Sequence, residues 1–488
     1  MNNPRILFWH RKDLRINDNN ALKRAFSLSN AITSTYILDQ NYSYDFNAKS
    51  RAWFLGNSLQ ELSQNWKNLG SRLIIDEGNP LILIPELAKL IDAKFVVWNK
   101  AIEPYEINRD LEIKNTLKEY NTDFIELWDH LLIEPSQIST GNNKPYSVYG
   151  PFYKKLKSKI NLLNSNKSFN NICNLKDLEI GLREKKKIDA SRLILDRFQK
   201  NINFAGVELC PCKPGELAAE KLLDQFICPD KIGSYDSSRD FPSQHGTSFL
   251  SASLRFGTIS IRKVWDATLF SDLINSNKYN QLSIETWQKE LVWREFYQHC
   301  LFNFPELEKG PYRKKWDLFP WQNNYEWFTR WSDGQTGVPI VDAAMRQLNS
   351  SGWMHNRCRM IVASFLVKDL ICNWQMGEEK FMKVLVDGDL AANNGGWQWS
   401  ASSGMDPKPL RIFNPYTQTK KFDPICKYIK FWIPELSKVS NADILNGEIS
   451  VLEKNNYSGA IVSHNIQQRL FKEPVSYTHL TLTKTSKV

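Results

Sequence analysis

The sequence lacks the patterns that identify several large classes of protein. Its eight cysteines are scattered, and Cys210-Pro-Cys212 has no second pair at a metal-binding spacing, so we expect reduced thiols and no metal site. No apolar run approaches the length of a membrane-spanning helix, and no signal peptide opens the chain. We therefore expect a cytoplasmic monomer that does not contact membranes and needs no obligate protein partner.

A dinucleotide-binding fingerprint is also missing, although the first part of the chain has the matching order of elements. Short apolar runs predict buried strands at residues 6–9, 31–38, 72–75, 94–98 and 123–127. Segments with helical periodicity separate them, at residues 52–69, 81–91 and 106–120. This alternation predicts a Rossmann-like α/β domain with a parallel sheet over residues 1–135. Because no Gly-x-Gly-x-x-Gly follows any of these runs, the sequence weighs against NAD binding.

Positive charge is in excess in this long chain. The formal net charge of +10 favours an anionic partner, with nucleic acid as the first candidate and a solvated basic surface as the alternative. The 488 residues predict two or three domains. Residues 136–205 are rich in Asn, Ser and Lys, so we predict an inter-domain linker there, with residues 146–152 as an anchor and Lys185-Lys-Lys187 as a solvated run. A mostly helical domain is predicted over residues 206–473.

One stretch combines acids, amides, paired glycines and tryptophans, namely Asp387-Gly-Asp-Leu-Ala-Ala-Asn-Asn-Gly-Gly-Trp-Gln-Trp-Ser400. Because glycines break helices and strands, we predict a sharply turning loop that approaches a ligand closely. The acid and amide side chains suit hydrogen bonding to a planar heterocycle, and the tryptophans can stack or pass electrons. A polar loop anchored by two aromatic side chains is the alternative.

Two further motifs allow a functional and a purely structural interpretation. Thr247, Ser248 and Ser251 precede a helix, where hydroxyls either cap the helix or bind an anion such as a diphosphate. Glu290 and Trp293 share one face of a helix predicted over residues 286–304, which suits either a nucleobase or a half-buried helix with a salt bridge. A second long helix is predicted from residue 356 to residue 374.

Together with Trp9-His-Arg-Lys-Asp-Leu-Arg15 and Gly352-Trp-Met-His-Asn-Arg-Cys-Arg-Met360, these motifs resemble the photolyase/cryptochrome family over residues 4–473. The chain is most similar to class I cyclobutane pyrimidine dimer (CPD) photolyases of the deazaflavin-antenna type. The resemblance implies an all-α FAD-binding domain after the α/β domain. It also implies light-driven electron transfer from excited FADH⁻ to dimers in UV-damaged DNA, with base flipping. Residues 474–488 no longer follow the family, and we expect a disordered or artefactual end there.

The resemblance leaves two rival functions to be separated. A blue-light cryptochrome without repair activity is disfavoured by the lack of a long C-terminal extension and by the pairing of Glu290 with Trp293. Six-four photoproduct photolyases carry a pair of histidines where this chain has Asn356 and Met360. Ala252 stands where proline is common in relatives, so the start of the helix that follows Thr247 and Ser248 departs from the family's pattern.

The family's functional residues carry over to matching positions of this sequence. The FAD-binding positions are Tyr235, Thr247, Ser248, Phe249, Leu250, Ser251, Trp287, Arg294, Asn356, Arg359, Asp387, Gly388, Asp389 and Asn393. The positions that contact the lesion or DNA are Arg239, Glu290, Trp293, Asn356, Met360 and Trp399. Among the FAD positions, Asn393 faces the reactive ring nitrogen, Asp389 bonds the pyrimidine edge, and Arg359 pairs with Asp387.

Two more groups of residues follow from the resemblance. Glu290 and Asn393 act in catalysis together with an electron relay formed by Trp397, Trp374 and Trp321. The antenna positions in the α/β domain are Asp39, Arg51, Glu103 and Arg109. The antenna chromophore implied by the resemblance is 8-hydroxy-5-deazaflavin, with methenyltetrahydrofolate as the alternative.

Overall fold

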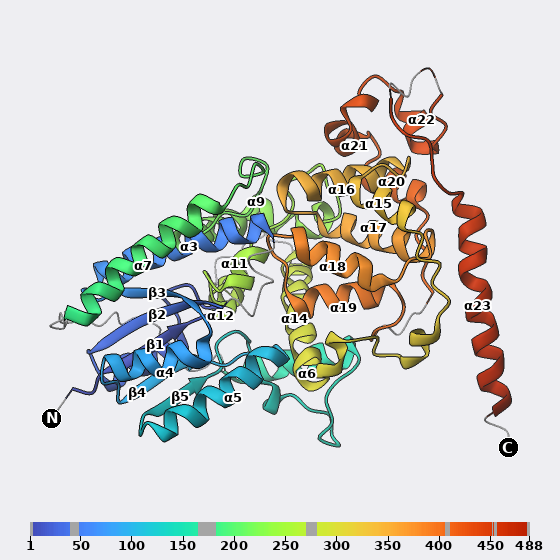
Figure 1. The fold of residues 1–488 in the computed structure, drawn as a ribbon. Coiled ribbons are helices and arrows are strands. Elements are labelled where there is room, and N and C mark those ends of the chain that lie inside the picture. The colour runs from blue at the N-terminus through green and yellow to red at the C-terminus, as the bar shows by residue number, and fades with distance from the viewer. Residues whose placement is uncertain are drawn as a thin grey trace. The chain divides into compact units, whose positions relative to one another are not determined.

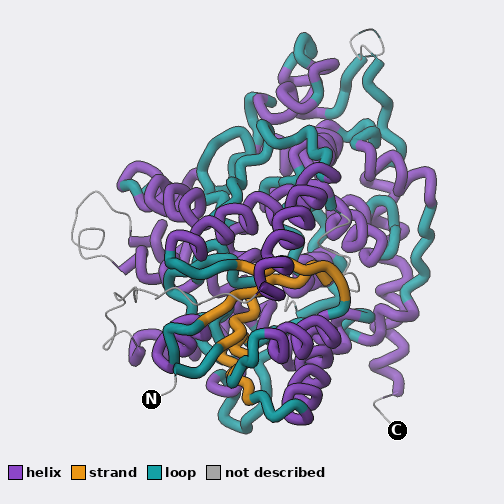
Figure 2. Tube along the Cα trace, turned by 60° about the vertical axis from the view of Figure 1, so that its left-hand side comes forward, coloured by secondary structure: helices purple, strands orange, loops and turns teal. Residues whose placement is uncertain are grey.

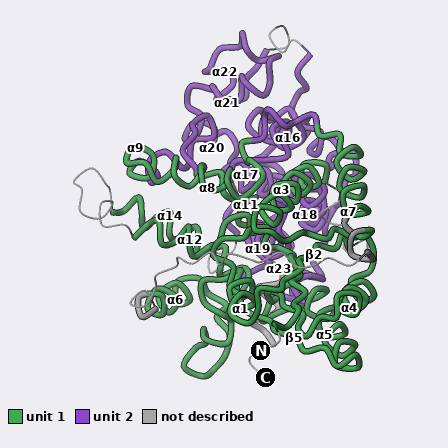
Figure 3. Tube along the Cα trace, turned by 90° about the vertical axis from the view of Figure 1, so that its left-hand side faces the viewer, with its two compact units in different colours: residues 1–204, 211–233, 248–305 green, residues 205–210, 234–247, 306–488 purple. Residues whose placement is uncertain are grey.

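The chain forms two compact units in the computed structural model (Figure 3). The structure describes residues 3–39, 48–163, 182–269, 281–405, 410–450, 452 and 456–485. Unit 1 comprises residues 1–204, 211–233 and 248–305, and unit 2 comprises residues 205–210, 234–247 and 306–488. The units interleave along the sequence. The predicted boundaries after residues 135, 205 and 473 divide the chain in a different way and remain a prediction.

Unit 1 is built on a five-stranded parallel sheet, drawn in orange in Figure 2. The strands are β1 (Ile6–His10), β2 (Ile32–Asp39), β3 (Leu73–Gly78), β4 (Phe95–Asn99) and β5 (Asp123–Leu127). Their order is β3-β2-β1-β4-β5, so the strand order reverses between β1 and β4. In open α/β sheets, ligands bind in the crevice outside the carboxyl ends of the strands at such a point. Each strand coincides with a predicted apolar run, and the predicted α/β domain is confirmed.

Helices cover both faces of the sheet because its strands are apolar on both sides (Figure 1). Leu7 and Trp9 of β1 point to the face covered by α4 (Pro80–Leu90) and α5 (Pro104–Glu119). Phe8 points to the opposite face, where its ring lies 6.4 Å from that of Trp66 in α3 (Lys49–Asn68). Helix α1 (Asn20–Leu28), which the sequence pattern missed, lies on the same face as α3, since Phe26 also contacts Trp66.

The predicted linker contains two helices, α6 (Tyr149–Leu163) and α7 (Leu182–Asn201). Helix α7 packs against the edge strand β3, where the Ile75 backbone N–H donates to Ser191 Oγ at 3.0 Å. Lys187 of the lysine run forms an ion pair with Asp76, so the prediction that this run is only solvated is wrong. Because an unpaired sheet edge exposes backbone hydrogen-bonding groups, a covering helix is favoured here.

The remainder of unit 1 is helical. Its helices are α8 (Glu216–Ile227), α9 (Pro229–Ile232), α11 (Ser251–Phe256), α12 (Ile261–Asp266) and α14 (Gln281–Asn303). Helix α14 includes the predicted helix over residues 286–304 apart from its last residue and begins earlier. Residues 146–152 anchor on α14, because the Tyr149 hydroxyl donates to the Lys289 carbonyl at 2.9 Å, and this predicted anchor is confirmed.

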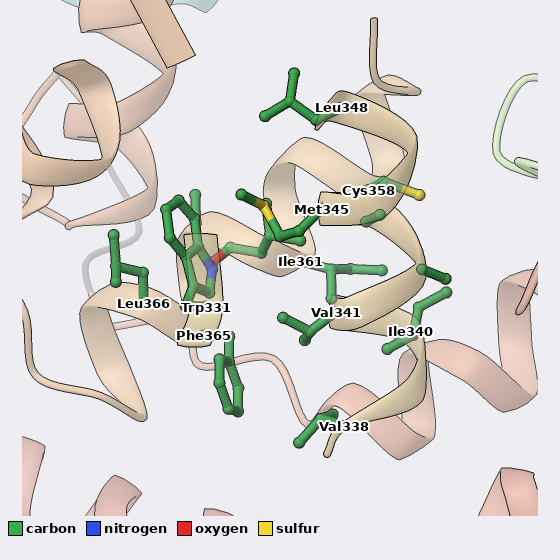
Figure 4. Packing of buried hydrophobic residues seen from close by; sticks show 14 of the residues in the cluster. Trp331, Val338, Ile340, Val341, Met345, Leu348, Cys358, Ile361, Phe365 and Leu366 are labelled. Atoms are coloured by element: carbon green, nitrogen blue, oxygen red, sulfur yellow. The ribbon is translucent and has the colours of Figure 1, made fainter. Parts of the chain in front are cut away.

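Unit 2 consists of helices around one apolar core. They are α10 (Tyr235–Ser238), α15 (Tyr325–Asp333), α16 (Pro339–Ser351), α17 (Asn356–Lys368), α18 (Trp374–Val384), α19 (Leu390–Ser400), α20 (Pro415–Phe422), α21 (Lys427–Trp432), α22 (Asn441–Asn446) and α23 (His464–Thr485). Figure 4 shows Trp331 of α15 among apolar side chains of α16 and α17, including Met345 and Phe365. The predominantly helical C-terminal region predicted from the sequence is confirmed.

The end of the chain differs from the prediction. We expected a disordered or artefactual end over residues 474–488, whereas α23 continues through Pro474 to Thr485. Its first turn is held by His464, whose Nδ1 lies 2.5 Å from Asp369 Oδ1, and Phe471 is buried in the core of unit 2. Within the described ranges of the chain, no helix combines the length and apolarity needed to cross a bilayer.

Candidate functional site

The glycine-containing stretch is a helix and not the predicted loop. Helix α19 begins after Asp389, whose Oδ1 accepts a hydrogen bond from the Ala392 backbone N–H at 2.8 Å. Asn393 Nδ2 donates to the Glu378 carbonyl at 3.0 Å, and Asn394 Nδ2 donates to Glu378 Oε1 at 2.9 Å. The cap and these bonds to α18 stabilise the helix and offset the low helix propensity of the glycine pair.

Glycine is present at Gly377 and at Gly396 for different reasons. A side chain at Gly377 of α18 would overlap the indole of Trp397, so glycine is required there for packing within the protein. A Cβ at Gly396 would meet no atom within 4 Å. A glycine inside a helix costs about 1 kcal/mol relative to alanine, and none of the described residues requires one here. The open space beside Gly396 therefore fits a flat group lying close to the backbone.

Arg359 and Asp387 form the predicted ion pair. Arg359 Nη2 donates to Asp387 Oδ1 at 3.0 Å and to Oδ2 at 2.8 Å, while its Nε donates to the Met354 carbonyl at 2.8 Å. The pair joins α17 to the segment that leads into α19, so it fixes the position of Asp389. Asn356, the first residue of α17, is exposed.

Met360 and Trp399 line one small hollow in unit 2, together with Ser364, Lys368, Ser400, Ser402, Arg411 and Phe413. The Arg411 guanidinium lies 5.9 Å from the centroid of the Trp399 ring. Both Met360 and Trp399 are half-buried, as expected of side chains that form a wall open to a ligand. The structure thus brings two of the predicted lesion-contacting residues together.

Unpartnered polar atoms gather in residues 234–247 and 353–359 of unit 2. Thr247 Oγ1 and Ser238 Oγ are buried without a hydrogen-bond partner, and so is Nε2 of His355. Burial lowers the pKa of His355 to about 4, so its ring is neutral at pH 7. A buried polar atom without a partner is costly, and a hydrogen-bonding ligand would remove that cost. The hydroxyls therefore fit an anionic group such as a diphosphate.

Apart from Tyr235 and Gly388, which belong to unit 2, the remaining predicted cofactor positions belong to unit 1. Phe249 adopts a left-handed backbone conformation at φ 55°, two residues before the start of α11. Trp287 is buried on α14, with its ring 4.7 Å from that of Phe226. Arg294 donates to His130, through Nη1 to the carbonyl at 3.1 Å and through Nη2 to Nε2 at 2.6 Å. Burial, followed by Arg294, lowers the pKa of His130 well below its usual value, so its Nε2 can accept this bond.

The predicted antenna residues meet at the carboxyl ends of the strands in unit 1. Asp39 ends β2 and accepts a hydrogen bond from the Tyr105 hydroxyl at 3.0 Å. Arg109 of α5 lies 3.4 Å from the same carboxylate. Glu103 immediately precedes α5 and forms an ion pair with Lys12, which follows β1. Three of the four predicted antenna residues are thus brought to one edge of the sheet.

Several of the charges at these strand ends pair with one another. Glu106 bonds to Lys12 at 2.9 Å and lies 3.8 Å from Arg109. Burial alone would raise the pKa of Glu106, but Lys12 and Arg109 outweigh it and lower the pKa to about 2. Arg51, the fourth predicted antenna residue, is completely buried on α3. The Glu106 carboxylate is therefore ionised and paired at neutral pH.

Comparison with known proteins identifies the family. Residues 6–169 match the family model of DNA photolyase, and residues 287–476 match that of the FAD binding domain of DNA photolyase. A deoxyribodipyrimidine photo-lyase from Synechococcus sp. is 47% identical over 471 residues, which cover 96% of this chain and 95% of the relative. The chain belongs to the DNA photolyase family.

Solved structures of photolyases agree with this assignment. A bacterial class III photolyase from Agrobacterium tumefaciens aligns over 99% of this chain and 98% of its own, with a TM-score of 0.85 and 32% identity. A cryptochrome from Synechocystis sp. aligns over 96% and 99%, with a TM-score of 0.82 and 26% identity. The predicted family, the FAD cofactor and the photo-lyase enzyme class are confirmed. The subtype, the antenna chromophore and the lesion remain predictions.

The tryptophans assigned to the photolyase electron relay lie in or against one core of unit 2. Trp397 and Trp374 are buried in it, and Trp321 packs against it while half-buried. Trp374 is the first residue of α18, which Asn373 caps. The prediction that one helix runs from residue 356 to Trp374 is wrong, because α17 ends at Lys368. Among the described aromatic side chains, no ring contact joins Trp374 to either of the other two.

Sequence analysis missed several residues of this photolyase site. Trp331 contacts the Trp397 ring at 6.1 Å, and Trp316 stacks with Trp321 at 6.2 Å. Both lie in the aromatic-rich segment of residues 316–331, but their neighbours are distant in sequence. Glu378 carries no local signal either. Burial, reinforced by Glu308, raises its pKa to about 7, because it is enclosed beside the amides of α19.

Proposed function

We propose that the protein repairs cyclobutane pyrimidine dimers in DNA with light. Bound in its reduced anionic form, FAD would lend one electron to the dimer and take it back once the cyclobutane ring has split, so no outside oxidant or reductant is needed. The protein binds and orients both partners and keeps water away from the reacting rings. A dimer inside a duplex cannot reach a buried flavin, so base flipping is part of the proposal, and the weakened pairing of a damaged site lowers its cost.

The residues around α19 hold the flavin in this proposal. Asp389 accepts hydrogen bonds from the pyrimidine edge of the ring, and the pairing of Arg359 with Asp387 fixes the backbone that leads to it. The amide of Asn393 faces the reactive ring nitrogen. Thr247 binds the diphosphate, which the unpartnered state of its hydroxyl supports.

The observation that carries the choice of lesion is the wall formed by Met360 and Trp399. These side chains line one hollow, so an apolar thioether and an indole face any ligand there. An indole stacks on the flat rings of a pyrimidine dimer. A six-four photolyase is expected to have histidine at the position of Met360. Trp293 and Glu290 of unit 1 contribute a second stacking surface and a hydrogen-bonding carboxylate in the proposal.

Repair assays with two lesions test the proposal. FAD-loaded protein, chemically reduced and illuminated, should restore thymines from an oligonucleotide with one cyclobutane dimer and leave a six-four photoproduct unchanged. Trp399→Ala should weaken binding to the dimer by about 1 to 3 kcal/mol. Met360→Leu conserves volume and should retain repair. Repair of the six-four lesion alone, or no repair of either lesion as for a photoreceptor, would contradict the assignment.

We further propose that Trp397, Trp374 and Trp321 pass an oxidising hole from the flavin site to the surface. The burial of the first two and the partial exposure of Trp321 support this direction. Trp397→Phe retains an aromatic ring in the core, so stability should fall by less than about 1.5 kcal/mol. Light-driven reduction of oxidised FAD should be lost, whereas repair after dithionite reduction should continue. Loss of both photoreduction and repair in this variant would contradict the relay assignment.

We also propose that the crevice of unit 1 holds a deazaflavin antenna. The convergence of Asp39, Glu103 and Arg109 at the carboxyl ends of the strands supports a ligand at this edge. Reconstitution with 8-hydroxy-5-deazaflavin should add a near-blue absorption band and sensitise repair at that wavelength. Binding of methenyltetrahydrofolate without binding of deazaflavin would show that the chromophore is misassigned.

A further inference from the structure

Trp293 belongs to a stack of aromatic rings within unit 1. The ring of Tyr149 lies 3.7 Å from that of Trp293, with an angle of 5° between their planes. Tyr149 also stacks with Tyr153, at 6.1 Å and 25°. Tyr149 of helix α6 therefore lies flat against the Trp293 indole of α14, and Tyr153 lies next to Tyr149.

The stack is held in place at both rings of α6. The Tyr149 hydroxyl donates to the Lys289 carbonyl at 2.9 Å. The Tyr153 hydroxyl donates to Glu285 Oε1 at 3.1 Å, and Lys157 lies 3.4 Å from the same carboxylate oxygen. Because Lys289 and Glu285 both belong to α14, the partner helix fixes the two tyrosine rings as well as the tryptophan.

Other ring contacts restrict Trp293. The ring of Phe296 lies roughly perpendicular to it at 5.8 Å, and that of Tyr297 lies 5.6 Å away. Trp293 nevertheless stays half-buried, although Tyr149 stacks on one of its faces. Part of the indole is therefore exposed and accessible to a ligand.

We propose that Tyr149 is a positioning residue that holds the Trp293 indole as a preformed stacking surface for the flipped lesion, and so increases discrimination between damaged and intact DNA. This inference rests on the stacking role given to Trp293 under the proposed function. Its physical basis is preorganisation. A side chain that is immobile before binding loses less conformational entropy when the ligand arrives, so more of the stacking energy appears as affinity.

A purely structural role of Tyr149, joining α6 to α14, makes a different prediction. Loss of that role would lower stability and affect the binding of damaged and intact DNA alike. Loss of the positioning role would lower only the ratio of the two affinities, because intact DNA offers no flipped base to the indole. The affinity ratio therefore separates the two roles.

The experiment measures this ratio in the dark with FAD-loaded, full-length protein. The probes are two fluorescent oligonucleotides of one sequence, with and without a single cyclobutane dimer. Tyr149→Leu should lower the damaged-to-intact ratio by about three- to tenfold, the range expected for ordering one side chain on binding. Tyr149→Phe keeps the stack and should retain the ratio. Tyr149→Met fills the same space with a flexible chain and replaces the leucine variant if that variant does not load FAD.

A matched control comes from the same segment. Tyr146 contacts Phe152, with ring centroids 6.2 Å apart, and makes no ring contact with Trp293 among the described residues. Tyr146→Leu should therefore leave the ratio unchanged. An equal fall in the ratio for Tyr146→Leu and Tyr149→Leu would overturn the proposal, because the effect would then be a general loosening of α6.

Trp293→Ala separates failure of this inference from failure of the proposed function. If the ratio falls for Trp293→Ala but not for Tyr149→Leu or Tyr149→Met, Trp293 stacks on the lesion and only the positioning role is refuted. If the ratio is unchanged for Trp293→Ala, the stacking role itself is refuted, and the inference with it. In the Trp293→Ala background, Tyr149→Leu should cause no further loss, since the two residues act through one contact.

Discussion

The strand ends of unit 1 and the flavin region of unit 2 are both proposed ligand sites, but several of their polar groups are in opposite states. In unit 1, Asp39, Arg109 and Tyr105 satisfy one another through hydrogen bonds and ion pairs. In unit 2, Thr247 Oγ1 and His355 Nε2 are buried without partners. A ligand in the first site must compete with existing pairs, whereas a ligand in the second satisfies groups that are already desolvated.

This difference predicts how tightly each site binds its ligand. Unpartnered buried groups destabilise the protein without ligand, so their cost is recovered when the cofactor binds. Mutually paired groups stabilise the protein alone and reduce what a ligand can gain. We therefore expect FAD to be held as a tight, resident cofactor and the antenna chromophore to be more readily lost during purification.

The largest expected effect concerns the Arg359–Asp387 ion pair, which is satisfied without a ligand although it lies in the flavin region. Asp387→Ala leaves Arg359 of the bidentate pair without its carboxylate. Because the Asp387 side chain is only 4% exposed, we expect a loss of about 3 to 5 kcal/mol in the free energy of unfolding, together with loss of bound FAD. Denaturant unfolding and flavin absorbance measure the two effects.

The matched control is an exposed pair on the neighbouring helix. Glu379 and Lys383 form an i,i+4 pair with side chains 67% and 60% exposed. Glu379→Ala should change the free energy of unfolding by no more than about 0.5 kcal/mol and leave FAD bound. Similar losses in the two variants would show that burial does not set the strength of the Arg359–Asp387 pair.

The second prediction concerns the titration of Glu378. Burial raises its pKa from 4.5 to about 7, so the folded state retains a proton that the unfolded state releases between these values. The free energy of unfolding should therefore fall as pH rises through this window. Glu378→Gln stays neutral and should be more stable than the original protein by up to about 3 kcal/mol at pH 8, with no difference near pH 4.5.

Urea unfolding at a series of pH values measures this effect. Glu435 serves as the control acid, because it is partly exposed and bonded to Arg346 at 2.8 Å. Glu435→Gln should not gain stability at high pH. A stability difference between Glu378→Gln and the original protein that does not vary with pH would contradict a raised pKa at this position.

The third prediction concerns the unpartnered Thr247 hydroxyl, whose removal should raise stability and lower affinity for FAD. Thr247→Val removes a buried, unsatisfied oxygen while conserving shape, so protein without FAD should gain about 1 to 2 kcal/mol in the free energy of unfolding. The same change should weaken FAD binding by about tenfold, because a bond to the charged diphosphate is lost. Thr247→Ser retains the hydroxyl and should show neither effect. Thermal unfolding of flavin-free protein and FAD titration are the two measurements.

The smallest expected effect is in unit 1, where removing a hydroxyl should lower the free energy of unfolding and not raise it as Thr247→Val should. Tyr105→Phe removes the 3.0 Å hydrogen bond to Asp39 and should lower the free energy of unfolding of the protein alone by about 0.5 to 1.5 kcal/mol. FAD content should be unchanged. A gain in stability, as expected for Thr247→Val, would break the contrast between the two sites.

Local patterns predicted much of unit 1. The strands were found because the strands of a covered parallel sheet are continuous apolar runs, a signal that needs no knowledge of the partner strand. The Arg359–Asp387 pair was found only through the resemblance, since its members are distant in sequence. The linker prediction missed α7, because its hydrogen bond from Ile75 to Ser191 joins residues whose sequence neighbourhoods show no sign of each other.

The sequence by itself determined the parallel α/β domain, the helical C-terminal region and the positions of the family's functional motifs, because these depend on periodicity and residue type along short segments. The helical state of most of the Asp387–Ser400 stretch depends on tertiary contacts, since the Asn393 and Asn394 side chains donate to Glu378 of α18 and offset the low propensity of its glycines. Only the tertiary structure placed Tyr149 against Trp293. Stacking depends on how two helices pack, and neither ring carries a local signal of the other.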